Sequence, residues 1–240
     1  MTARFICGLQ PVREAIAAHG AALERVLVEN SDSPPLAAVA RFASDRGAKV
    51  ARMSRANLDK LARGARHQGA IAFAPALRIL ELNELELGAS TLLVILDEIE
   101  DPQNFGAVVR SAVAMGATAV VFPEHHAAPL TAATFRASAG AVEHATLCRI
   151  GGVPSAIETL KRQGVHCVGL DTGGDTLLAN VDLAQKTALI LGAEGKGLRK
   201  SVKAACDVLA RLPMTNTIAS LNVSAAAAMA LYEVRRQRTS

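Results

Sequence analysis

The sequence predicts an α/β protein in two parts: a small α/β domain, and after it a mostly parallel sheet covered by helices on both faces. The main observation is that apolar runs of strand length alternate with helix-like segments from residue 92 onward. A second observation is that the excess positive charge lies in the first 75 residues. A third is the acidic, leucine-containing stretch 76–91, which we interpret as a linker between domains at 1–75 and 92–240.

The C-terminal part supplies the elements of the parallel sheet. Its expected strands are the apolar runs at residues 92–96, 118–122, 145–149, 165–170, 187–191 and 208–212. Its expected helices span residues 104–115, 131–139, 154–163, 198–206 and 219–236. Near-continuous apolar strands with intervening helices are typical of a sheet that is buried on both faces.

The stretch at residues 92–115 combines a strand, an acidic turn and a helix, which is the usual layout at the ligand-binding edge of an α/β sheet. Asp101 is suited to cap the helix, and Pro102 to its first position. Arg110 lies on this helix between two alanines, whose small side chains leave the guanidinium free to reach a ligand. A solvated surface arginine is the more common explanation when the helix is considered alone.

The first 75 residues read as a small α/β domain. Helices are expected after Pro11, over 35–44 and after Ser54, and strands over 25–28, 49–52 and 68–74. Eleven Lys and Arg accompany six Asp and Glu here, whereas the rest of the chain contains fifteen and sixteen. A basic domain joined to a near-neutral one suggests that a polyanion is bound by the first and modified by the second, although a solvated charged face explains the charge equally well.

Several classes of protein are disfavoured by what the sequence lacks. There is no run of about 18 apolar residues and no apolar signal-peptide core near the N-terminus, so we expect a cytoplasmic protein that does not enter a membrane. The four cysteines are dispersed without C-x-x-C spacing, as in buried reduced thiols. No G-x-G-x-x-G motif follows the first strand, and no G-x-x-x-x-G-K-[ST] motif occurs anywhere.

Two late loops are better candidates for a cofactor site. Residues 191–198, LGAEGKGL, carry three glycines around Glu194, so that backbone groups can approach a small ligand. Residues 212–224 place small polar side chains at the start of the last helix: Thr215, Asn216, Thr217, Ser220, Asn222 and Ser224. Lys196 is the one cation within 191–198, so this pair of loops suits an adenosine-like ligand better than a triphosphate. Ordinary turn chemistry would explain either loop alone.

These stretches together resemble the SpoU, or TrmH-type, RNA 2′-O-ribose methyltransferases of the SPOUT superfamily. DPQNFGAVVRSA is similar to the first motif of the family, LILGAEGKGL to the second and LPMTNTIASLNVSAAAA to the third. GLQPVREAI and ARHQGAIA resemble its ribosomal-protein-like RNA-binding domain. The resemblance covers almost the whole chain.

The resemblance implies a trefoil knot in the C-terminal domain, S-adenosylmethionine as cofactor, a homodimer, no metal, and RNA rather than DNA as partner. The implied substrate is a guanosine of 23S ribosomal RNA. The implied catalytic residues are Asn104, Arg110, Glu194, Ser220 and Asn222. Cofactor contacts are expected at Gly192, Leu212 and Leu221, with Gly197 and Thr217 beside them, and RNA contacts at Arg52, Arg55, Arg63, Arg66 and His67.

Two points of the resemblance need physical comment. Asn216 stands where the family usually has glycine, and asparagine is the residue that best tolerates the left-handed backbone a glycine would adopt. Arg110 corresponds to the proposed general base of the family, but a guanidinium resists deprotonation. We therefore expect Arg110 to stabilise the developing oxyanion and to hold a phosphate, with the base role left open.

Three alternatives remain from the sequence. The chain could methylate the ribose of transfer RNA, or could be an RNA-binding ribosome-assembly factor without catalysis. It could also be a metal-dependent hydrolase, which would require ligands at Asp97 and Asp101.

Overall fold

The chain forms two compact units in a computed structural model, which describes residues 3–215 and 219–239. Unit 1 comprises Met1–Leu77 together with Leu130–His144, and unit 2 comprises Arg78–Pro129 together with Ala145–Ser240. The segment 130–144 therefore packs with the N-terminal residues, whereas the sequence had placed it in the C-terminal domain.

Unit 1 is built on a four-stranded mixed sheet in the order β1-β4-β2-β3. Its strands are β1 (Arg4–Cys7), β2 (Arg25–Glu29), β3 (Val50–Met53) and β4 (Ala70–Ala74), and its first three helices are α1 (Leu9–His19), α2 (Pro34–Asp45) and α3 (Arg55–Ala62). β2 and β3 are parallel, and the other pairs are antiparallel. Apolar residues of α1 and α2 cover one face of the sheet, and those of α3 cover the other.

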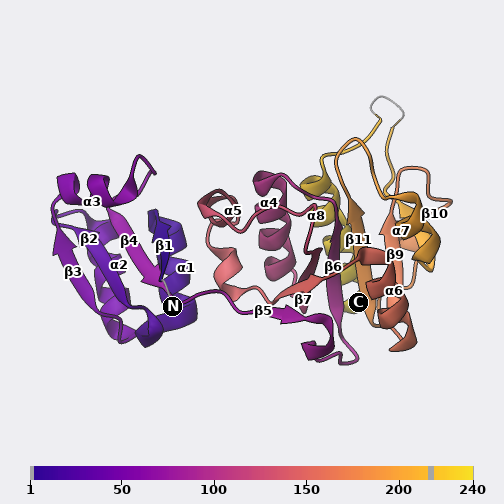
Figure 1. Ribbon diagram of the computed structural model, residues 1–240, viewed down its shortest axis with the longest axis horizontal. Helices are drawn as coiled ribbons and strands as arrows, with labels where there is room; N and C mark the ends of the chain where they lie inside the picture. Colours follow the sequence, from indigo (N-terminus) through magenta and orange to yellow (C-terminus); the bar gives the residue numbers. More distant parts are fainter. Residues whose placement is uncertain (1–2, 216–218, 240) are drawn as a thin grey trace. The chain divides into compact units, whose positions relative to one another are not determined.

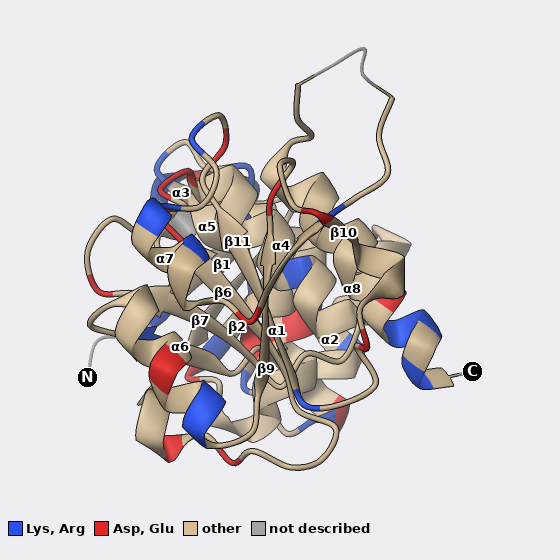
Figure 2. Cartoon of the chain, turned by 90° about the vertical axis from the view of Figure 1, so that its right-hand side faces the viewer, with Lys and Arg blue, Asp and Glu red and all other residues tan. Residues whose placement is uncertain are grey.

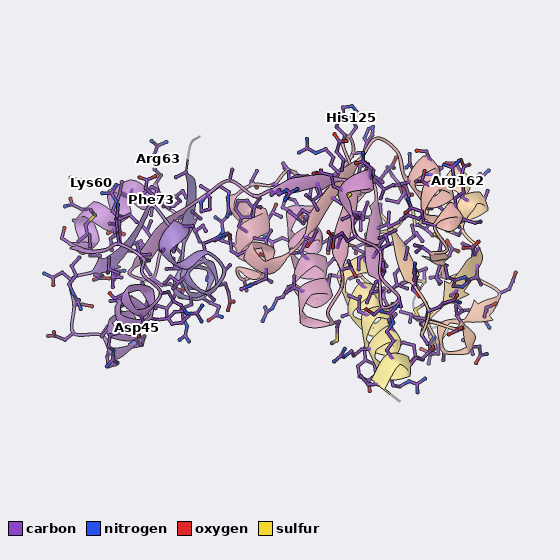
Figure 3. The ribbon with its side chains drawn as sticks, turned by 90° about the horizontal axis from the view of Figure 1, so that it is seen from below. Asp45, Lys60, Arg63, Phe73, His125 and Arg162 are labelled. Atoms are coloured by element: carbon purple, nitrogen blue, oxygen red, sulfur yellow. The ribbon has the colours of Figure 1, made fainter. Side chains whose placement is uncertain are left out.

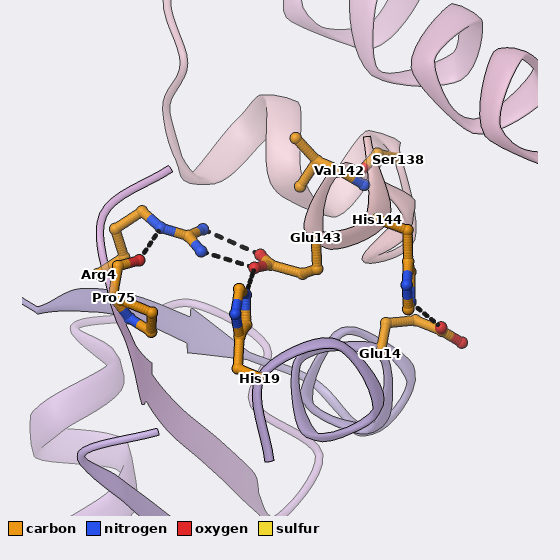
Figure 4. A network of polar contacts seen from close by, with 8 residues as sticks. All are labelled: Arg4, Glu14, His19, Pro75, Ser138, Val142, Glu143 and His144. Carbon is orange, nitrogen blue, oxygen red and sulfur yellow. Dashed lines mark hydrogen bonds and ion pairs between the residues drawn. The ribbon is translucent and has the colours of Figure 1, made fainter. Parts of the chain in front are cut away.

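The segment 130–144 contributes α5 (Ala132–Ala137) and a 3₁₀ turn, η3 (Ala141–His144), to unit 1. Glu143 of this turn is buried, and it receives two guanidinium contacts from Arg4 and one from His19 (Figure 4). Gly140 packs so closely on α1 that an added Cβ would lie 2.8 Å from Cβ of Glu14. These contacts explain why the segment is part of unit 1.

Unit 2 contains an eight-stranded parallel sheet in the order β10-β12-β9-β11-β6-β7-β8-β5. Its strands are β5 (Ile79–Glu81), β6 (Leu92–Asp97), β7 (Ala119–Pro123), β8 (Leu147–Ile150), β9 (His166–Leu170), β10 (Thr176–Leu177), β11 (Thr187–Gly192) and β12 (Val208–Arg211). The six predicted strands are thus confirmed. The short β5 and β10 were not predicted, and β5 lies in the stretch that we interpreted as a linker.

Helices cover both faces of this sheet (Figure 1). α6 (Val153–Arg162) and α7 (Lys200–Ala205) pack on one face, and α4 (Pro102–Ala114) and α8 (Val223–Thr239) lie together on the other. The basic residues of the last turn of α8 are visible near the C-terminus in Figure 2. No described helix is long and apolar enough to cross a membrane.

α8 begins at Val223, four residues after its predicted start. The physical reason is that Asn222 caps it: its Oδ1 accepts the backbone N–H of Ser224 at 2.9 Å. The preceding residues are therefore left to the loop that the sequence singled out as a cofactor site.

The four cysteines are unpaired, and three of them are buried, as expected for reduced thiols. Burial raises the pKa of Cys148 to about 11 and that of Cys167 to about 12. Both thiols are therefore protonated at neutral pH and are unreactive.

Candidate functional site

A cavity of about 330 Å³ opens at the carboxyl ends of three neighbouring strands, β9, β11 and β12. This is the edge where parallel sheets bind ligands. Six of the residues singled out from the sequence line it: Gly192, Glu194, Gly197, Leu212, Ser220 and Leu221. The two glycine-rich and polar loops therefore form one cavity, as the sequence analysis expected.

The loop after β11 folds back on itself, and Gly192 makes this possible. Gly197 donates its N–H to the carbonyl of Ala193 at 2.8 Å, which closes the loop. A Cβ on Gly192 would lie 2.2 Å from the carbonyl carbon of Gly197 and 2.3 Å from the nitrogen of Leu198, so no other residue fits there. The result is a cradle of backbone groups that suits a small, adenosine-like ligand.

Three predicted catalytic residues meet at the rim of this cavity. Nδ2 of Asn222 donates to Oδ1 of Asn104 at 2.8 Å and lies 3.1 Å from Oε2 of Glu194. Nδ2 of Asn104 lies 3.2 Å from the same carboxylate oxygen. Glu194 and Asn222 are exposed and Asn104 is half-buried, so together they present an oriented carboxylate to solvent. We call Asn104, Glu194 and Asn222 the polar triad.

Arg110 is not part of the polar triad. It follows Asn104 by six positions on α4, which places it about 240° around the helix axis and about 9 Å along it. The residue is exposed, and it makes no hydrogen bond or ion pair with any residue that the structure describes. Its guanidinium is therefore available to a ligand or to a second molecule.

The loop with Glu194 is anchored by a contact that the sequence analysis missed. Asp97, at the end of β6, is fully buried and accepts Nε of Arg199 at 2.9 Å and the backbone N–H of Arg199 at 3.1 Å. The hydrogen bond to Asp97 raises the pKa of Arg199, so the guanidinium stays charged. The pair joins the loop after β6 to the loop after β11.

The same contacts bear on the hydrolase alternative. Asp97 is engaged by Arg199, and Asp101 caps α4 by accepting the backbone N–H groups of Gln103 at 3.2 Å and Asn104 at 3.0 Å. Both carboxylates that the alternative requires as metal ligands therefore already have protein partners.

The four predicted RNA-binding arginines are exposed on unit 1. Two of them also contact the end of β2: Arg55 lies 3.6 Å from the carboxylate of Glu29, and Arg52 lies 3.5 Å from its carbonyl oxygen. Arg63 ends α3 in a left-handed conformation with a φ of 48°. Lys60 and Arg63 lie on one side of unit 1, and Asp45 lies on the opposite side (Figure 3).

His67 requires a correction, because it is 4% exposed and cannot contact RNA directly. Its Nε2 lies 2.9 Å from the carboxylate of Asp59, and its Nδ1 accepts the N–H of Gly69 at 3.0 Å. His67 thus shapes the loop that presents Arg63 and Arg66. Its place in a polar, glycine-rich loop had suggested exposure, but the ring is held by Asp59 of the preceding helix and by the backbone of Gly69.

Two residues of the sequence analysis, Asn216 and Thr217, lie outside the described residues. Conversely, the loop after β9 was not predicted as part of the site, although its residues 170–172 line the cavity. The signal was present, since Asp-Thr-Gly-Gly follows an apolar strand just as the two recognised loops do.

Comparisons with known proteins agree with this geometry. Residues 91–232 match the SpoU rRNA Methylase family, and residues 5–80 match the RNA 2′-O ribose methyltransferase substrate binding domain. The 23S rRNA (guanosine-2′-O-)-methyltransferase RlmB of Xylella fastidiosa is 36% identical over 242 residues, which cover 98% of this chain and 97% of that protein. RlmB of Coxiella burnetii is 37% identical over 215 residues, covering 88% and 86%.

Solved structures give the same result. A crystal structure described as an RNA 2′-O ribose methyltransferase has a TM-score of 0.80 and 28% identity, covering 98% of this chain and 89% of that one. The SpoU methyltransferase AviRb of Streptomyces viridochromogenes has a TM-score of 0.81 at 24% identity, covering 99% and 90%, and shares the fold. The glycine cradle, the motif order and these matches lead to one conclusion: the chain belongs to the SpoU family of RNA methylases and carries that family's substrate-binding domain.

Proposed function

We propose that this protein transfers a methyl group from S-adenosylmethionine to the ribose 2′-hydroxyl of a guanosine in 23S ribosomal RNA. The observation that carries the proposal is that Glu194 lines the cofactor-sized cavity and also belongs to the polar triad. A methyl donor in the cavity and a hydroxyl at the triad would therefore be neighbours. The names of the relatives from Xylella and Coxiella support the guanosine of 23S RNA as substrate.

The cavity fits S-adenosylmethionine in chemistry and size. Its wall around Gly192 and Gly197 is backbone, and Leu212 and Leu221 add apolar surface for a purine ring. These residues would bind the cofactor together with Thr217, which the sequence analysis placed beside them. When bound, S-adenosylmethionine supplies an electrophilic methyl group on a sulfonium.

The residues at the rim would prepare the ribose hydroxyl. Methyl transfer requires that this oxygen is aligned, loses its proton and is stabilised as negative charge develops. The amides of Asn104 and Asn222 fix the carboxylate of Glu194, which keeps free lone pairs to accept the hydroxyl hydrogen. Ser220 lines the same cavity and can add a further hydrogen bond.

Arg110 would stabilise the developing oxyanion and hold an RNA phosphate. A guanidinium stays protonated in proteins, so electrostatic stabilisation suits it better than proton removal. Its exposure on α4 and its freedom from partners among the described residues support a role toward a molecule outside this unit.

The experiment that tests this role compares Arg110→Ala with Arg162→Ala, which removes an exposed helix arginine that does not line the cavity. Arg110→Ala is expected to lower methyl transfer by about 100-fold or more, as for the loss of a transition-state donor. Cofactor affinity by calorimetry is expected to stay within about threefold for both variants. A parallel loss of transfer and of cofactor affinity would contradict the role.

Ribosomal RNA is favoured over transfer RNA because residues 5–80 match a dedicated substrate-binding domain, and that domain carries the excess positive charge. The rival without catalysis, an assembly factor, is disfavoured because the polar triad is assembled. The two rivals differ in one assay: transfer RNA would take up labelled methyl groups in the first case, and no RNA would in the second.

A homodimer is also part of the proposal. α8 presents an exposed stripe of Ala225, Met229 and Tyr232, and the latter two are 44% and 59% exposed. Ala227 and Ala230 are instead buried within their own chain, so they do not provide this surface. The mass in solution should be that of two chains for the wild type and of one chain for Tyr232→Glu, because a charge in an apolar interface is costly.

The trefoil knot and a cytoplasmic location complete the proposal. The knot follows from the family resemblance, and the strand order, in which β9 lies between β11 and β12, is compatible with it. The location is supported by the proposed substrate, since ribosomal RNA and S-adenosylmethionine are both cytoplasmic in bacteria.

A further inference from the structure

The loop after β9 provides a charged group to the cofactor cavity for which the proposed mechanism has no role. β9 lies between β11 and β12 in the sheet, so its carboxyl end is in the middle of the site. Leu170, Asp171 and Thr172 line the cavity there. The side chain of Asp171 is 12% exposed, and a carboxylate in such a place requires compensation.

Asp171 is held in one orientation by its neighbours. Its backbone N–H donates to the carbonyl of Ala210 at 2.9 Å, and its Oδ1 accepts the N–H of Gly173 at 2.9 Å. Its Oδ2 lies 2.6 Å from Nζ of Lys203, which also lines the cavity. A carboxylate offers about four acceptor positions, so the contacts of its oxygens with Gly173 and Lys203 leave other positions available to a ligand.

The carboxylate faces the glycine loop that forms the cradle. A Cβ built on Gly197 would lie 3.7 Å from Oδ2 of Asp171, so the two loops approach each other at this point. A ligand lying on the glycine loop would therefore have the carboxylate within reach.

The charge of Lys203 indicates which part of the ligand would be recognised. Because Lys203 already offsets the charge of Asp171, a second cation gains little there, whereas neutral hydroxyl donors retain their full hydrogen bonds. S-adenosylmethionine carries cations at its sulfonium and ammonium groups and neutral donors at its ribose. We propose that Asp171 accepts hydrogen bonds from the ribose hydroxyls of the bound cofactor and that Lys203 positions its carboxylate; this inference rests on the proposed function.

The test uses calorimetry on the full chain with three ligands: S-adenosylhomocysteine, 5′-methylthioadenosine, which lacks the amino-acid part, and the 2′,3′-dideoxy form of the latter. The wild type should bind 5′-methylthioadenosine at least tenfold more tightly than its dideoxy form, as expected for hydrogen bonds to a charged acceptor. Asp171→Ala should weaken the binding of S-adenosylhomocysteine and of 5′-methylthioadenosine by similar factors. It should also reduce the affinity ratio between 5′-methylthioadenosine and its dideoxy form to less than about threefold.

Further variants keep the test decisive. Asp171→Asn retains the shape of the side chain if the alanine variant does not fold, and it should lower the same affinity ratio in part. Asp175→Asn removes an exposed carboxylate from the same loop outside the cavity, and it should change each affinity by less than about twofold. Lys203→Gln should weaken binding less than Asp171→Ala, because the acceptor remains.

Two results would overturn the inference. One is an affinity ratio between 5′-methylthioadenosine and its dideoxy form that is as large in Asp171→Ala as in the wild type, because another group would then recognise the ribose. The other is a loss of S-adenosylhomocysteine affinity with 5′-methylthioadenosine unchanged, which would assign Asp171 to the amino-acid part. A wild type that binds none of the three ligands would instead refute the proposed function itself, and the inference with it.

Discussion

The buried carboxylate of Glu143 should be a main source of stability for unit 1, and Glu143→Gln tests this. The side chain is 1% exposed, and its oxygens lie 2.9 and 2.6 Å from the guanidinium of Arg4 and 2.8 Å from Nε2 of His19 (Figure 4). Arg4 is itself 14% exposed and also contacts the ring of Phe135 at 5.2 Å. Glutamine preserves the volume but turns one acceptor into a donor facing Arg4.

The expected cost follows from these exposures. Removing one partner of a buried ion pair costs about 3–5 kcal/mol, because the other charge is left uncompensated. Arg4 and His19 retain some access to water, so we expect the lower end, about 3 kcal/mol. A matched control is Glu14→Gln, which breaks the pair between Glu14 and His144. The side chain of Glu14 is 31% exposed and that of His144 is 34% exposed. That change should cost less than about 1 kcal/mol.

Hydrogen exchange followed by mass spectrometry gives the local readout. A loss of about 3 kcal/mol should accelerate exchange in the segment 130–144 by about 150-fold if the segment opens before the rest of unit 1. Glu14→Gln should accelerate it by less than about fivefold. Equal exchange rates in the two variants would show that the buried pair stabilises the segment no more than the exposed one.

Two further predictions follow from the site and from unit 1. Gly192→Ala should abolish measurable binding of S-adenosylhomocysteine by calorimetry, because its Cβ would lie 2.2 Å from the backbone of Gly197; retention of affinity within about threefold would show that the loop can move aside. Replacing the four predicted RNA-binding arginines, Arg52, Arg55, Arg63 and Arg66, by glutamine should weaken RNA binding and reduce the slope of log K against log salt by about 3–4. An unchanged slope would refute their assignment.

Local patterns predicted most of the fold and the cavity. The apolar runs marked the six long strands of unit 2 because a parallel strand buried on both faces must be apolar along its whole length. The glycines of residues 192–197 marked the cradle because the close approach of Gly192 to Gly197 is a backbone requirement that leaves a mark on composition. The polar triad followed from the family resemblance rather than from periodicity.

Features that depend on distant contacts could not be predicted. Asp97 and Arg199 are 102 positions apart, and nothing near either one indicates the pair. Glu143 meets Arg4 across 139 positions, so nothing in the local sequence indicated that the segment 130–144 packs with unit 1, and it was assigned to the C-terminal domain instead. His67 was expected at the surface for a different reason: its local sequence is that of an exposed loop, and composition does not show that the ring turns back to contact Asp59, eight positions earlier.

The most direct test of the proposed function is a map of 2′-O-methyl positions in total RNA from a strain that lacks this gene, compared with the same strain carrying the wild-type chain or Arg110→Ala. We expect one guanosine of 23S ribosomal RNA to lose its 2′-O-methyl group, and the wild type, but not Arg110→Ala, to restore it. An unchanged 23S map, or a change confined to transfer RNA, would contradict it.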